Sequence, residues 1–352
     1  MGESWCVVRR ALVSCVTVIV IVTPIVIAGC APLHEGVNLI EGDFHPPRIL
    51  SVATTDEHTI ELGFDKGAEI IPGRLAVSPD LGEPVVSGSG GTRLRLRFPE
   101  ATVAGVEYVV DAGVQDARGN SLAFLARVYG HNPYPPDLLI NELNPRASTT
   151  NPERVELVAR SSGNLAGITL YNGSPSDYNS RFIFPSVEIE AGDFIILHFR
   201  PEGTPEEVNE TVAKDESGGS RAVDHAWDYW VAEGGGLPSN NGVLALYTTP
   251  RGRIMDAVIW SNRNSESDQL YRGFGTRRMM EWVDEVVGDG GWAVAGYEAA
   301  PEDAVDPEGS TATRSIGRNS HSEDTDTRLD WHIVPTSGAS FGAPNSDDVY
   351  SP

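Results

Sequence analysis

The residues from Glu323 to Asp330 read EDTDTRLD and place carboxylates at short, regular intervals. Asp324, Asp326 and Asp330 could supply oxygen ligands to a calcium ion, which prefers carboxylate and carbonyl oxygens. The segment lacks the glycine that a calcium-binding loop uses for its sharp turn, and aspartates of this kind commonly cap turns. We therefore expect turn capping and no resident cofactor or metal, with calcium at these three aspartates as the alternative.

Trp227, Tyr229 and Trp230 form a dense aromatic segment that is followed by a glycine-rich stretch. Loop aromatics can stack on sugar rings or anchor a protein partner, because Trp and Tyr bury a large area at a small cost in rotamer entropy. These three residues are the candidate ligand-binding residues, for an unidentified protein or glycan. The alternative, which we favour, is that they fold back and cap the core of their own domain.

Other patterns that resemble catalytic sites are incomplete. The segment DESGG around Ser217 is similar to a serine peptidase motif, but Glu216 precedes the serine and no suitable histidine segment accompanies it. The eight histidines do not fall in zinc-binding spacings. We predict no catalytic residue and no enzyme. A metal-assisted hydrolase of the phosphoesterase kind, built from Asp and His residues of the insertions described below, is the alternative.

Composition limits the partners that the chain can have. Its 352 residues include 26 Lys+Arg and 50 Asp+Glu, for a formal net charge of −24. Nucleic-acid binding needs a basic surface, so no nucleic-acid partner is expected. With 37 Gly and 24 Pro, the chain contains many turns. Short strands in an all-β fold are the expected architecture.

The first 29 residues have the features of an export signal. Arg9 and Arg10 precede an uncharged stretch that ends at Cys30. The residues Ile27-Ala28-Gly29-Cys30 resemble the bacterial lipobox, in which the cysteine is lipidated and becomes the mature N-terminus.

This resemblance implies lipidation of Cys30, a membrane partner through the N-terminal lipid, and a tether over residues 30–47. Ala31 is not an Asp retention signal, which favours the outer membrane, with the periplasmic or surface face open. The alternative is an uncleaved membrane helix.

Residues 48–132 contain about seven short apolar runs separated by turn residues, which predicts an immunoglobulin-like β-sandwich. In the run from Thr92 to Phe98, leucines alternate with Arg93, Arg95 and Arg97, as in a half-buried strand with a solvated arginine face. The region, with its closing turn DARGN, resembles the bacterial Ig-like domains of surface-layer and exported proteins.

After the proline-rich link HNPYPP, residues 133–352 again show strand patterns, at 138–143, 154–159, 168–171, 182–189 and 194–199, and a hairpin of strands 243–249 and 254–260. The segments INELNP, ERVELV, LAGITLYNG and NNGVLALYTTPRGRIMDAVIW, with the terminal TSGASFGAPNS, resemble the lamin tail domain, an Ig-like sandwich, over residues 137–345. Two insertions, at 201–242 and 261–313, depart from the compact family pattern. Within the second, TRRMMEWVDEVV predicts one short helix.

The resulting prediction is an exported, lipid-anchored envelope protein of two tandem Ig-like β-sandwiches, the second with long insertions and one short helix. The resemblances imply non-catalytic binding, adhesion or envelope scaffolding.

Overall fold

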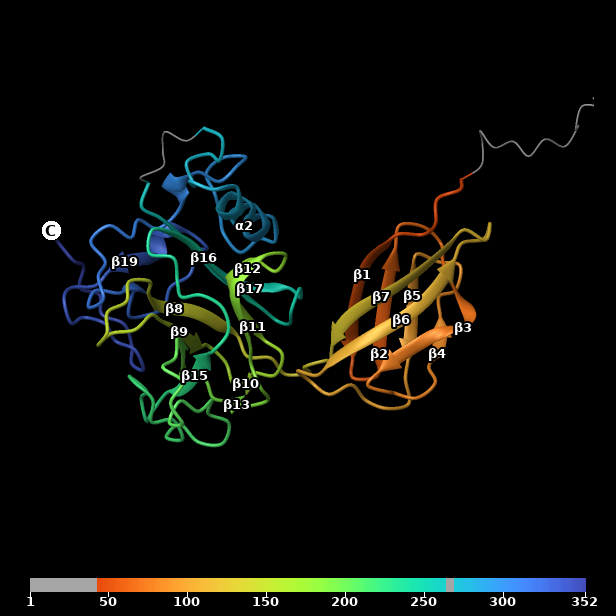
Figure 1. Ribbon diagram of the computed structural model, residues 1–352, viewed down its shortest axis with the longest axis horizontal. Coiled ribbons are helices and arrows are strands. Elements are labelled where there is room, and N and C mark those ends of the chain that lie inside the picture. Colours follow the sequence, from red (N-terminus) through yellow and green to blue (C-terminus); the bar gives the residue numbers. More distant parts are fainter. Residues whose placement is uncertain (1–42, 264–268) are drawn as a thin grey trace, which may run out of the picture. The chain divides into compact units, whose positions relative to one another are not determined.

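The computed structural model describes residues 43–263 and 269–352 (Figure 1). The chain divides into residues 1–45 and a compact unit of residues 46–352. The predicted signal peptide, Cys30 and all but the last residues of the tether lie outside the described residues. Among the described helices, none combines the length and the apolar character that crossing a membrane requires.

The first group of strands forms a sandwich of two antiparallel sheets (Figure 1). One sheet has the order β1-β2-β5-β4 and the other β3-β6-β7. The strands are β1 (Ile49–Asp56), β2 (Thr59–Phe64), β3 (Glu69–Ser78), β4 (Val85–Ser87), β5 (Arg93–Arg97), β6 (Glu107–Gln115) and β7 (Ser121–Tyr129). Leu94 and Leu96 of β5 are buried in a core that also contains Ile60 and Val110, from β2 and β6. The predicted alternation in this strand is therefore confirmed.

The second group of strands forms a larger sandwich. A six-stranded sheet has the order β15-β14-β9-β8-β18-β19, a four-stranded sheet has the order β12-β11-β16-β17, and β10 pairs with β13. The bounds are β8 (Leu138–Asn144), β9 (Arg154–Ala159), β10 (Gly163–Asn164), β11 (Thr169–Gly173), β12 (Tyr178–Ile183), β13 (Glu188–Ile189), β14 (Phe194–Phe199), β15 (Trp227–Val231), β16 (Asn241–Tyr247), β17 (Ile254–Ser261), β18 (Ile316–Arg318) and β19 (Trp331–Ile333). Leu157 and Leu197 of the larger sheet share one core with Leu244 and Val258 of the smaller sheet. The all-β fold is confirmed.

The predicted helix is present as α2 (Arg277–Gly288). Thr276 caps it, since its side chain accepts a hydrogen bond from the Met279 backbone N–H. Met279, Trp282, Val283 and Val286 are buried, and the helix contacts β16 and β17. The second insertion therefore contributes to the core of the larger sandwich. Two single-turn 3₁₀ helices, η1 (Pro301–Asp303) and η2 (Arg328–Asp330), are the other helical elements of the described residues.

Two segments differ from the prediction. Residues 182–189 do not form one strand, because β12 ends at Ile183 and a separate short strand begins at Glu188. Pro185 lies between them, and proline has no N–H to donate to a sheet. The first insertion contains a strand that the sequence did not predict, β15, which pairs in parallel with β14 at the edge of the larger sheet.

Candidate functional site

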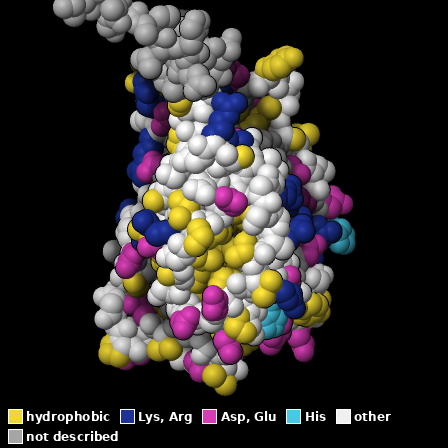
Figure 2. Space-filling view, turned by 90° about the vertical axis from the view of Figure 1, so that its right-hand side faces the viewer, with side chains coloured by type: hydrophobic (Ala, Val, Ile, Leu, Met, Phe, Trp, Pro, Cys, Tyr) yellow, Lys and Arg dark blue, Asp and Glu magenta, His cyan; other side chains and the backbone are white. Residues whose placement is uncertain are grey.

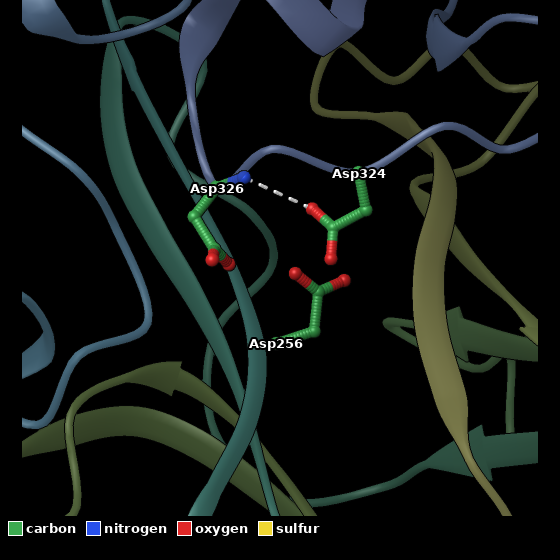
Figure 3. A group of neighbouring side chains, drawn as sticks. All are labelled: Asp256, Asp324 and Asp326. Atoms are coloured by element: carbon green, nitrogen blue, oxygen red, sulfur yellow. Dashed lines mark hydrogen bonds between the residues drawn. The ribbon is translucent and has the colours of Figure 1, made fainter.

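Asp256 meets two aspartates that are distant from it in sequence, Asp324 and Asp326, beside the larger sheet (Figure 3). Asp256 lies on β17, whereas Asp324 and Asp326 lie in the segment between β18 and β19. Each offers one carboxylate oxygen within 4.8 Å of the others, and the Asp326 backbone N–H donates to Asp324 Oδ1 over 3.2 Å. Asp256 is fully buried, while the other two are half-buried.

A fully buried arginine, Arg318 of β18, supplies the positive charge of this cluster. Its Nη2 donates to both carboxylate oxygens of Asp256, at 3.1 and 3.2 Å, and its Nη1 lies 3.0 Å from Asp324 Oδ1. Nη1 also donates to the Glu323 carbonyl and lies 3.4 Å from Asp330 Oδ2, and Nε donates to the Ile140 carbonyl. All three guanidinium nitrogens are therefore engaged, as a buried guanidinium requires.

Burial, and the excess of carboxylates over the one guanidinium, change the acidity of the aspartates. Burial and the neighbouring Asp324 raise the pKa of Asp256 to about 7, although Arg318 opposes the shift. Burial and Asp324 also raise the pKa of Asp326. The Asp256 carboxyl is therefore partly protonated near neutral pH.

As a metal site, the cluster offers three carboxylates, and a calcium ion takes six to eight oxygen ligands. Arg318 already contacts two of these carboxylates, which disfavours a second cation on the same oxygens. Asp330, the third predicted calcium ligand, is not part of the group. Its carboxylate accepts hydrogen bonds from Thr325 and from the Thr327 backbone N–H, so it caps the turn at η2.

A second polar network covers the outer face of the larger sheet. Glu142 of β8 and Glu156 of β9 lie directly opposite each other and are fully buried. Glu142 accepts hydrogen bonds from the Ser315 and Ser340 hydroxyls, and the Gly342 backbone N–H donates to Glu156 over 2.5 Å. Burial raises the pKa of both carboxyls, and their mutual repulsion contributes at Glu156. These contacts hold the C-terminal segment against the sheet.

A buried histidine–aspartate pair lies further along the same face. His198 Nε2 lies 2.5 Å from Asp228 Oδ1, and the imidazole stacks on Trp230 with ring centroids 4.2 Å apart. Burial lowers the pKa of His198, which keeps the ring neutral. Its Nδ1 has no hydrogen-bond partner among the described residues.

Ser217 belongs to the same neighbourhood but does not complete a catalytic triad. Its Oγ accepts from Trp230 Nε1 at 3.0 Å and donates to the Glu206 carbonyl. A triad needs the serine hydroxyl hydrogen-bonded to the histidine, and here His198 makes no such bond. The arrangement fixes the first insertion to the sheet, as does Glu210, which accepts the Asp228 and Ser217 backbone N–H groups.

The predicted ligand-binding aromatics lie inside the domain and not on an open loop. Trp227, Tyr229 and Trp230 are all on β15, with 7%, 0% and 6% of their surface exposed. Tyr229 packs against Phe184, and Trp227 Nε1 donates to Asp193. Rings buried to this extent cannot stack on a ligand without opening the strand, so the structure supports the alternative in which they complete the core.

Asp256, Arg318 and the Glu142–Glu156 pair were not predicted as site residues. Asp256 interrupts an otherwise apolar strand, IMDAVIWS, and a charged residue in such a strand is a sequence signal for a buried partner. Arg318 lies in the short strand IGR, where no comparable signal exists. The partners come from segments more than 60 residues apart, which a single sequence does not connect.

The fold defines an all-β protein with its polar clusters built into the second sandwich, and comparison with known proteins identifies the family. The sequence model of the family described as TP_1001 protein second domain matches residues 136–333, more than half of the chain. The chain therefore belongs to this family.

An uncharacterized protein of Treponema pallidum (strain Nichols) is 29% identical over 167 residues, which cover 47% of this chain and 42% of that protein. The chain thus spans less than half the length of this relative.

Two solved structures are similar in part. The N-terminal part of the bacterial S-layer protein SbsC is 14% identical, with a TM-score of 0.23, over 61% of this chain and 43% of that chain. Dimeric latent PorU from Porphyromonas gingivalis is 12% identical, with a TM-score of 0.18, over 62% of this chain and 20% of that one. TM-scores this low carry no argument about function.

Proposed function

We propose that this protein is an exported lipoprotein, anchored through Cys30, whose two β-sandwich regions act in non-catalytic binding, adhesion or scaffolding in the cell envelope. The Ig-like and lamin-tail-like motifs of the sequence, and the lipobox-like residues that end at Cys30, support this proposal. Its partners are the membrane, through the lipid, and a protein or glycan that the sandwiches bind.

The observation that carries the non-catalytic part is how the polar groups of the second sandwich are used. Arg318, Glu142, Glu156 and Asp228 are fully buried and hydrogen-bonded to groups of the same chain. Reactive groups need access to a substrate, and these groups instead connect strands, the first insertion and the C-terminal segment. Such networks fix a rigid scaffold on which a binding surface can be presented.

The test of location is protease treatment of intact and lysed cells, with an antibody against the second sandwich. We place the body outside the cytoplasm, so digestion on intact cells, or after permeabilisation of the outer membrane alone, is expected. Protection until the cytoplasmic membrane is broken would contradict export.

The alternative function is a metal-assisted hydrolase. It was expected in the two insertions, whereas the aspartates that could hold a metal, Asp256, Asp324 and Asp326, lie outside them and favour it only by the approach of their oxygens to within 4.8 Å. Calcium or manganese should then raise the unfolding temperature of the wild type but not of Asp324→Ala, and the metal-loaded protein should hydrolyse phosphate esters. Equal unfolding temperatures with and without metal would exclude this alternative.

A further inference from the structure

The outer face of the sheet β1-β2-β5-β4 carries a stripe of exposed arginines. Arg93, Arg95 and Arg97 of β5 have 70%, 61% and 65% of their side chains exposed. They share one face because alternate residues of a strand point to the same side. Glu61 of β2, opposite Arg95, accepts hydrogen bonds from Arg93 and Arg95, and Arg97 lies 3.9 Å from Asp56. The stripe therefore keeps an excess of positive charge.

This face is unusual in a chain with a net charge of −24. Residues 46–130 contain 8 Lys+Arg and 11 Asp+Glu, whereas residues 131–352 contain 16 and 35. The negative charge is thus concentrated in the second region of the chain. Figure 2 shows one side of the molecule, on which basic and acidic side chains are interspersed rather than separated into two large fields.

The other side chains of this face are mostly small, apart from the exposed Val85 of β4, which pairs with Arg97. Ala53 of β1 and Ser87 of β4 belong to the same row as Glu61 and Arg95, and both are exposed. Beside small neighbours, long arginine side chains can extend their charged ends outward from the sheet.

We propose that this arginine face docks the first sandwich onto an anionic membrane surface. The proposal rests on the anchor proposed above. If Cys30 carries the lipid, residues 31–47 link it to the sandwich, and 17 residues reach at most about 60 Å when fully extended. The face then lies within reach of the headgroups, where each basic side chain strengthens binding to an anionic bilayer about fivefold. Acidic side chains that lie more than about 8–10 Å from the bilayer are screened from it.

The test measures docking of an anchored chain without relying on lipidation in the cell. Residues 31–352 carry a hexahistidine tag in place of Cys30 and are bound to nickel-chelating lipid in phosphatidylcholine vesicles, with or without phosphatidylglycerol. A fluorophore on Ser87→Cys, the single cysteine of this chain, reports energy transfer to a dye in the bilayer.

Phosphatidylglycerol should increase energy transfer, and salt should reverse the increase. Arg93→Gln, Arg95→Gln and Arg97→Gln together should abolish it. Glu61→Gln removes the countercharge and should shift the docking equilibrium about fivefold toward the bound state.

The matched control removes the same charge elsewhere, by Arg160→Gln, Arg253→Gln and Arg328→Gln, all exposed residues of the second region. The control should dock as the wild type does. Thermal unfolding confirms that each variant is folded.

Equal energy transfer in all variants would overturn the proposal. The proposal would also be overturned if energy transfer on pure phosphatidylcholine vesicles increased with the surface density of the protein. That result would identify a second copy of the chain as the partner of this face. Neither result would contradict lipidation of Cys30, because in this experiment the nickel-chelating lipid replaces the natural anchor.

Discussion

Replacing Arg318 by methionine should destabilise the second sandwich more than any exposed substitution. The change keeps a long apolar side chain but removes the guanidinium that contacts Asp256, Asp324 and Asp330 at 3.0–3.4 Å. Breaking a buried ion pair by removing one partner costs about 3–5 kcal/mol, because the remaining charges are left uncompensated. At roughly 2–4 °C per kcal/mol for a unit of this size, the unfolding temperature should fall by about 10 °C.

The pH dependence of this penalty provides a second, independent expectation. The pKa of Asp256 is raised by burial to about 7 in the folded protein, well above the usual value of an aspartate. A carboxyl with a raised folded pKa makes the folded state bind more protons than the unfolded state, so its ionisation lowers stability as pH rises between these values. Without Arg318 the raised pKa rises further. The penalty of Arg318→Met should therefore grow as the pH rises above about 7 and should level off below that value.

The assay is calorimetric or circular dichroism melting of the wild type and variant between pH 5 and 8.5, with Arg328→Met as the matched control. Arg328 lies ten residues further along the chain and is exposed, so its loss should change stability by less than about 0.5 kcal/mol. The double variant Arg318→Met with Asp256→Asn should recover part of the loss. A penalty below about 1 kcal/mol at pH 8, or one that does not vary with pH, would refute the reasoning.

Two further predictions concern buried groups of the second sandwich. Burial lowers the pKa of His198, so the unfolded chain binds a proton at a higher pH than the folded chain does. As the pH falls below 6.5, the wild type should therefore lose stability relative to His198→Asn, measured by urea unfolding at several pH values. Parallel stability curves for the two proteins would contradict a buried neutral imidazole. Trp282→Ala should cost about 3–5 kcal/mol, whereas Glu281→Ala, next to it on the exposed face of α2, should be nearly neutral in the same assay; equal effects would show that the helix does not pack on the sandwich.

Periodic features of the sequence predicted the fold well. Leu94 and Leu96 alternate with exposed arginines, and Met279, Trp282 and Val286 recur at helical spacing, so each buried face could be assigned from the pattern alone. The pattern failed at β15, because glycine-rich and acidic neighbours made WDYWV resemble a loop. Its pairing partner, β14, ends 28 residues before β15 begins, and that contact is set by tertiary packing.

The polar clusters were less predictable. Asp324 was singled out from its own segment, but its partners Asp256 and Arg318 belong to strands β17 and β18 of different sheets. Asp330 was predicted to be a calcium ligand together with Asp324 and Asp326, but its carboxylate accepts hydrogen bonds from the nearby Thr325 instead. Local spacing identifies which residues carry charge, whereas the topology decides which charges meet.

The measurement that tests the account most directly is the intact mass of the protein purified from membranes after growth with a palmitate analogue. The account predicts a chain that begins at Cys30, carries the label, and leaves the membrane fraction in the Cys30→Ser variant. An unlabelled chain that retains residues 1–29 and stays in the membrane in that variant would contradict the lipid anchor and support an uncleaved helix.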